Sequence, residues 1–171
     1  MAPVSVLGLA YEAIVLGGFA VQLAVQPKAR TARGAVTALL RWSLAVNVGV
    51  AGLMAAYAHT ARAAETARSI GWPPGSPFQF EVAMAGLGCG IAGILCIWLG
   101  GLFWWATAII SGTFLLGAAY GHLRDIAVSG NMAPGNAGVI LYTDILVPLV
   151  HLLLLVTLSR MRPDAAAGAR S

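Results

Sequence analysis

The residues best suited to chemistry in this sequence are histidines and carboxylates near the ends of long apolar segments. His59, Glu81, His122 and Asp144 are the ligand types that iron, manganese or zinc sites use. No local spacing such as His-Glu-x-x-His joins them, so a metal site needs the fold to bring four segments together. One hypothesis is therefore a metal- or redox-cofactor-binding protein with these four residues as ligands.

The last apolar segment carries two polar side chains at a spacing that places them on one helical face. Asp144 and His151 are seven residues apart, which corresponds to about 700° of helical rotation. Pro148 lies between them and has no N–H to bond the carbonyl of Asp144. Because lipid does not stabilise polar groups, we expect this face to point into the protein.

A polar pocket is predicted at the side where several of these segments end. The candidate lining residues are His59, Gln79, Glu81, His122, Asn136, Tyr142, Asp144, His151 and Glu12. Two loops rich in proline, glycine or asparagine, residues 71–81 and 131–136, are predicted to be ordered and to cover this pocket.

The elements that must position these residues are membrane spans. Of the 171 residues, 59% are hydrophobic and 9% are charged, and the mean hydropathy is +0.83. Soluble domains carry about 25% charged residues. Residues 82–123 contain no Asp, Glu, Lys or Arg. Because a span takes about 20 apolar residues, that run fits two spans.

Five apolar segments follow from this pattern, and they predict an all-α, polytopic transmembrane helical bundle. The segments are residues 4–25, 35–58, 82–99, 102–122 and 139–158. The expected organisation is one bundle over residues 1–159 and a small, polar, disordered cytoplasmic tail over residues 160–171.

Basic residues near the span ends predict the orientation. One side collects Lys28, Arg30, Arg33, Arg41, Arg160, Arg162 and Arg170, and the other collects Arg62, Arg68 and Arg124. This excess predicts an outside N-terminus and a cytoplasmic C-terminus in the cell (inner) membrane. The polar pocket would then face away from the cytoplasm. No basic block or aromatic–basic repeat indicates nucleic-acid binding.

Small residues predict where the spans approach each other. Gly86 and Gly90 are four residues apart, as are Gly117 and Gly121. Such pairs let helix backbones come close in lipid, where hydrophobicity does not drive association. We expect both pairs to mark helix contacts.

Several motifs together resemble a family of uncharacterised small bacterial and archaeal membrane proteins. They are Gly71-Trp72-Pro73, Ser76-Pro77-Phe78-Gln79 with Glu81, Gly121-His122, Ala133-Pro134-Gly135-Asn136, and Tyr142 with Asp144. The resemblance covers about residues 55–150. It implies a membrane fold and carries no activity.

Three functions fit these observations, and the sequence leaves open whether the protein is an enzyme. The first is an accessory or structural subunit that docks a membrane protein or a second copy, with its polar groups satisfied by one another. The second is the metal or redox-cofactor site. The third is binding or transport of a small solute, lipid or quinone along Glu12, Asn47, Asp144 and His151.

Overall fold

The computed structural model describes residues 4–162 and the side chains of residues 8–162. These residues form helices only: α1 (Val4–Val25), η1 (Pro27–Arg30), α2 (Ala32–Ser43), η2 (Leu44–Val50), α3 (Ala51–Ala61), α4 (Ala63–Ile70), α5 (Phe78–Leu95), α6 (Leu102–Ser129), α7 (Pro134–Ala137) and α8 (Val139–Arg160). Of the predicted tail, residues 163–171 lie outside the described residues.

Five helical stretches in the described residues are long and apolar enough to cross a membrane. They are Gly8–Val25, Ala32–Ala61, Phe78–Leu95, Leu102–Ser129 and Pro134–Arg160. The second stretch joins α2, η2 and α3 into one rod, and the fifth joins α7 to α8. The predicted all-α architecture with five spans is thus confirmed.

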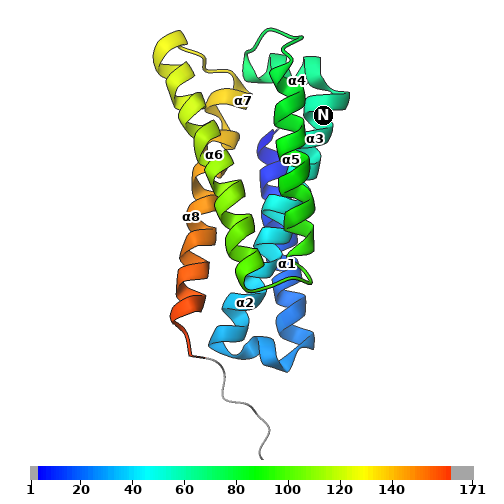
Figure 1. Ribbon diagram of the computed structural model, residues 1–171, viewed down its shortest axis with the longest axis vertical. Coiled ribbons are helices and arrows are strands. Elements are labelled where there is room, and N and C mark those ends of the chain that lie inside the picture. Colours follow the sequence, from blue (N-terminus) through cyan, green and yellow to red (C-terminus); the bar gives the residue numbers. More distant parts are fainter. Residues whose placement is uncertain (1–3, 163–171) are drawn as a thin grey trace, which may run out of the picture.

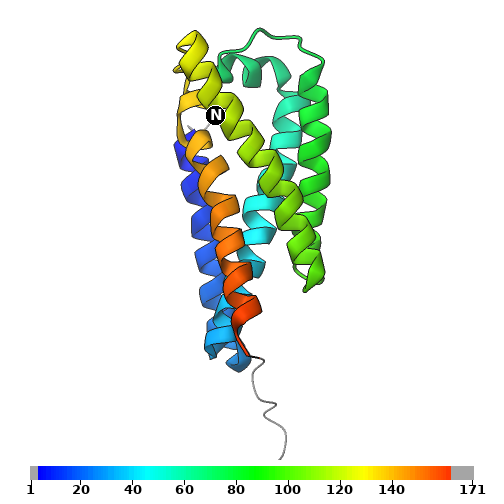
Figure 2. The ribbon, with the colours of Figure 1, turned by 60° about the vertical axis from the view of Figure 1, so that its left-hand side comes forward.

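The spans form an elongated bundle with two distinct ends (Figure 1). One end holds α4, α7 and the loops beside them, and we call it the α4–α7 end. The opposite end holds η1 and the last residues of α8, and we call it the η1 end. Along the bundle α3 packs on α5, α6 on α8, and α1 on α2 and α8, and Figure 2 shows α1 beside α8.

The glycines of α5 allow its backbone to approach the second rod. A Cβ atom added to Gly52 would lie 2.7 Å from the carbonyl oxygen of Gly86 and 2.9 Å from the Cα of Gly90. The predicted contact at Gly86 and Gly90 is therefore confirmed. The matching prediction for α6 is wrong, because a Cβ at Gly117 or Gly121 would meet no atom within 4 Å.

Two helix boundaries differ from the sequence expectation. The fourth span does not end at His122, because α6 continues to Ser129 and ends where Gly130 adopts φ 66°. Residues 123–129 contain neither proline nor glycine, so nothing breaks the helix earlier. The third span begins directly after Pro77 and ends at Leu95, four residues earlier than predicted at both ends.

The second rod contains a wide turn near its middle. Residues Leu44–Val50 are π-helical, and Asn47 lies at the centre of that segment. π-Helical segments are rare in proteins, and those that occur are often found at functional sites. The buried apolar core lies beside it and consists of Leu40, Leu44, Val48, Cys96, Trp104 and Leu155.

Candidate functional site

His122 and Asp144 meet between α6 and α8 near the α4–α7 end. The Nε2 atom of His122 lies 3.7 Å from Oδ2 of Asp144, and the two side chains are 11% and 7% exposed. The helices come close below this point, where a Cβ on Gly112 would lie 3.2 Å from the Cβ of Pro148. The structure therefore pairs two of the predicted site residues.

Asn136 of α7 determines which nitrogen of His122 carries a proton. The amide nitrogen of Asn136 donates to the Asn131 carbonyl at 2.8 Å, so its Oδ1 atom faces Nδ1 of His122 at 2.7 Å. An amide oxygen only accepts, so Nδ1 of His122 is the donor. The Nε2 atom is left facing Asp144.

Asn131 joins this pair to the rest of the α4–α7 end. Its amide nitrogen donates to Asp125 Oδ2 at 2.6 Å and to the Ile70 carbonyl at 2.9 Å. Its Oδ1 atom accepts from the backbone N–H of Ala133 at 3.1 Å. We call Asp125, Asn131, Asn136, His122 and Asp144 the end cluster. It connects α4, α6, α7 and α8.

The two loops predicted to cover the pocket contact each other at this end. Gly71 ends α4 with φ 86°, and the N–H of Trp72 then donates to the Ala67 carbonyl at 2.8 Å. A Cβ on Gly71 would lie 2.6 Å from Oδ1 of Asn131, and one on Gly135 would lie 2.7 Å from the Ser69 carbonyl oxygen. Gly71 of the first loop thus packs against the Asn131 side chain of the second loop, and Gly135 packs against the α4 backbone, at distances that a Cβ atom would block.

A second polar network lies deeper in the bundle. His151 of α8 is 1% exposed, and its Nε2 atom lies 2.9 Å from the Ser43 hydroxyl. The amide nitrogen of Asn47 donates to the same hydroxyl at 3.3 Å and to Oε1 of Glu12 at 3.0 Å. We call Glu12, Asn47, Ser43 and His151 the midspan network. It joins α1, the second rod and α8.

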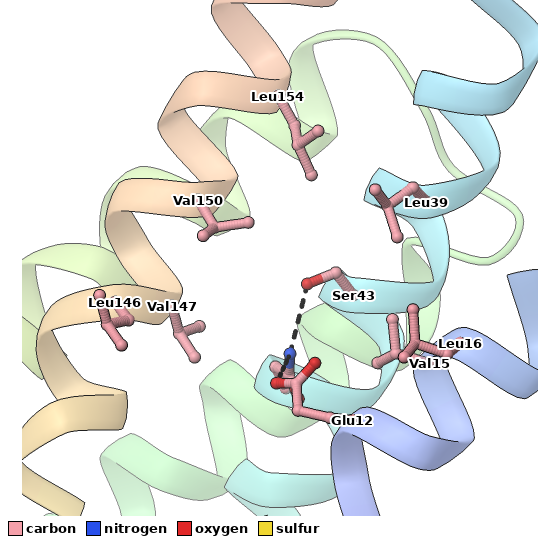
Figure 3. Close-up of a pocket in the computed structure, with 10 residues that line it drawn as sticks. Glu12, Val15, Leu16, Leu39, Ser43, Leu146, Val147, Val150 and Leu154 are labelled. Carbon is pink, nitrogen blue, oxygen red and sulfur yellow. Dashed lines mark hydrogen bonds between the residues drawn. The ribbon is translucent and has the colours of Figure 1, made fainter.

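The midspan network borders a cavity of about 230 Å³ (Figure 3). The cavity is lined by Glu12, Val15, Leu16, Leu39, Ser43, Asn47, Leu146, Val147, Val150 and Leu154. Val15 and Ser43 are buried, whereas Glu12, Leu16, Leu146 and Val150 are exposed. The cavity therefore opens sideways between α1 and α8.

Glu12 lies at a depth where an exposed carboxyl group is unusual. It follows the start of α1 by eight residues, or about 12 Å at 1.5 Å per residue. We predicted that Glu12 lines one pocket with His122 and Asp144, but its carboxyl group accepts its hydrogen bond from Asn47. Because charged groups are costly in hydrocarbon, a carboxyl group there is a candidate functional group.

The remaining predicted pocket residues lie elsewhere. Gln79 is buried, but its amide donates to the Ala63 carbonyl at 2.8 Å and fastens α5 to α4. Glu81 and Tyr142 are exposed. Nδ1 of His59 is buried and has no hydrogen-bond partner among the described residues. Within the described residues no three His, Cys, Asp or Glu side chains come together as metal ligands. The metal site stays a prediction without a converged ligand set.

Sequence reasoning missed three residues that the structure places in the two networks. Asn131 and Asp125 belong to the end cluster, and Ser43 lies between Asn47 and His151. The only sequence signal for Ser43 is its position four residues before Asn47, which puts the two on one helical face.

Comparison with known proteins gives one match. The model of a family described as "Family of unknown function (DUF6790)" matches residues 6–164. No curated protein and no solved structure matches the chain.

Proposed function

This chain belongs to the DUF6790 family, whose function is unknown, and we propose that it binds a lipid-phase molecule in the midspan cavity. The observation that carries this proposal is the carboxyl group of Glu12, exposed at the rim of an apolar cavity and within the first candidate span. A carboxyl group that served only to hold helices together would be better buried among them, because lipid solvates it poorly.

The lining residues define the chemistry of the proposed ligand. Apart from Glu12, Ser43 and Asn47, every lining residue is Val or Leu. Oε1 of Glu12 accepts from Asn47, and within the described residues Oε2 accepts no hydrogen bond. The ligand therefore has an apolar body and a hydroxyl head group that donates a hydrogen bond to Oε2, as in a hydroxyl-bearing lipid or the reduced form of a quinone.

The cavity volume indicates how much of such a molecule is enclosed. Sites that enclose a drug-sized ligand measure about 300–1,000 Å³, and this cavity measures about 230 Å³. The cavity thus accommodates the head group and the first part of the body. The remainder lies in the bilayer, which it reaches between Leu16 of α1 and Val150 of α8.

Retention of a bound molecule tests this proposal. The protein is purified in mild detergent, and the apolar molecules that remain bound are extracted and quantified by mass spectrometry. We expect the unmodified protein to retain about one equivalent of a compound bound in this cavity, in addition to any lipid that is bound elsewhere. Val150→Trp, which fills the cavity from its rim, should remove that compound.

The matched control is Leu153→Trp. Leu153 lies on the same helix and is 65% exposed, but it does not line the cavity. This variant should retain the compound. Equal retention by the Val150→Trp and Leu153→Trp variants, or no bound compound in the unmodified protein, would show that the proposal is wrong.

A second candidate function is an accessory subunit that docks a membrane protein or a second copy of this chain. The end cluster supports it, because its His, Asn and Asp side chains satisfy one another and need no ligand. The mass of the protein in lipid nanodiscs, measured by light scattering, tests the second-copy form. A single chain per disc at all protein concentrations, with no product from crosslinking in native membranes, would speak against both forms.

We also propose that the protein lies in the cell (inner) membrane with its η1 end facing the cytoplasm. Among the described residues, Lys28, Arg30, Arg33, Arg41, Arg160 and Arg162 lie at or near the η1 end, against Arg62, Arg68 and Arg124 at the other. Cysteines introduced at Lys28 and at Arg124 should react differently with a membrane-impermeant thiol reagent in whole cells. Only the cysteine at position 124 should be labelled. Labelling at position 28 alone would show that the protein has the opposite orientation.

A further inference from the structure

A second cavity lies at the η1 end, between α2, α6 and α8. It measures about 400 Å³ and is lined by Arg33, Thr37, Gly101, Trp104, Trp105, Leu155, Leu158 and Ser159. Four of the eight lining residues are thus tryptophan or leucine, and one lining residue, Arg33, is charged. It lies where the spans end, at the level at which lipid head groups meet the hydrocarbon.

Arg33 is fixed in this cavity by the end of α8. Its Nη1 atom donates to the carbonyl oxygens of Leu158 and Met161, at 2.9 and 2.7 Å. A guanidinium group has five N–H donors, and within the described residues Nε and Nη2 make no hydrogen bond. The group is thus held rigidly with donors left over for an acceptor in the cavity.

Arg41 adds a second positive charge beside the same wall. Its guanidinium carbon lies 5.9 Å from the ring centre of Trp104, which lines the cavity. Its Nε atom is buried and has no hydrogen-bond partner in the described part of the chain. A buried donor without a partner costs free energy. An anion in the cavity would offset part of this cost by its attraction to the charge of Arg41.

The charges of this end are of one sign. Among the described residues the acidic side chains Glu12, Glu65, Glu81, Asp125 and Asp144 all lie in the middle of the bundle or toward the α4–α7 end. Nothing in the described part of the η1 end therefore neutralises its arginines. Basic pockets between spans recognise phosphate-bearing lipid head groups by this combination of charge and apolar wall.

We propose that the cavity at the η1 end is a binding site for an anionic phospholipid. The phosphate accepts hydrogen bonds from the free donors of Arg33. The parts of the acyl chains nearest the head group lie along Trp105 and Leu158. Arginine suits this role because its planar fork matches phosphate geometry. This site is separate from the midspan cavity and does not depend on the function proposed above.

Native mass spectrometry of the detergent-solubilised protein tests the site. The probes are phosphatidylglycerol and phosphatidylcholine with identical acyl chains, with inorganic phosphate in a separate arm. We expect phosphatidylglycerol to bind more tightly than phosphatidylcholine, and inorganic phosphate not to displace it at equal concentration. Arg33→Gln should weaken phosphatidylglycerol binding, whereas Arg124→Gln, an exposed arginine at the other end, should not.

Because Arg33 also caps α8, a second pair of variants changes only the charge of the cavity. Ser159 lines the cavity and is exposed, and its hydroxyl donates only to the Val156 carbonyl. Ser159→Lys should tighten phosphatidylglycerol binding about fivefold and Ser159→Glu should weaken it about fivefold, the effect of one charge near an anionic surface. Equal binding by both variants, or displacement of the lipid by inorganic phosphate, would overturn the proposal.

Discussion

The end cluster and the midspan network use similar side chains in opposite ways. In the end cluster His122, Asn136 and Asn131 form a chain of short hydrogen bonds, and Gly71 packs against the Asn131 side chain. In the midspan network the chain of hydrogen bonds ends at Glu12, which is exposed beside a cavity. A polar group that bonds to its neighbours on all sides holds helices together. One that faces an apolar cavity is available to a ligand.

The largest expected effect comes from breaking the end cluster. Asn136→Leu leaves Nδ1 of His122 and the carbonyl of Asn131 without their partners. Since each buried group left unpaired costs about 1–3 kcal/mol, we expect a loss of about 2–6 kcal/mol in the free energy of unfolding. Denaturant unfolding in detergent micelles measures it. The Tyr142→Phe control, at an exposed position on α8, should change stability by less than about 0.5 kcal/mol.

A change in the midspan network should raise the free energy of unfolding instead of lowering it. Glu12→Leu removes a carboxyl group that lies exposed in the span, while Asn47 keeps its bond to Ser43. We expect stability to rise by about 1 kcal/mol, because charged groups are unfavourable at this depth. The compound retained in the midspan cavity should be lost in the same variant. A stability loss as large as that of Asn136→Leu would make Glu12 a structural residue and erase the difference between the two regions.

The smallest expected effect is the coupling between the two regions. A double-mutant cycle of His122→Ala and Asn136→Ala should give a coupling free energy of about 0.6–1.7 kcal/mol, the range for hydrogen bonds between membrane helices. The corresponding cycle of His122→Ala and Glu12→Ala should be additive within about 0.5 kcal/mol, because the residues share no partner. Coupling of similar size in both cycles would mean that the two regions act as one unit.

Much of the fold could be predicted because it depends on local sequence. The charge-free stretch of residues 82–123 covers most of two of the five candidate spans. The spacing of Asp144 and His151 predicted a common buried face, and both side chains are 5% exposed or less. The small-residue pair Gly86 and Gly90 likewise predicted a close helix contact.

The assignment of polar residues to one site was less successful, because depth in the membrane does not determine which helices are neighbours. Glu12 was grouped with His122 by depth, but α1 packs on η2, and Asn47 of η2 donates a hydrogen bond to Glu12. Asn131 was expected only as part of an ordered loop that covers the pocket. Its bond to the Ile70 carbonyl joins residues 61 positions apart, and no local pattern encodes such a contact.

A crystal structure grown from a lipidic phase, with the protein kept in its native lipid, tests the central claim most directly. We predict an ordered apolar molecule in the cavity between α1 and α8, with a polar atom about 2.5–3.0 Å from Oε2 of Glu12. The same crystals of Val150→Trp should lack it. A cavity that is filled by water alone, or that is closed by contact of Leu16 with Val150, would contradict the account.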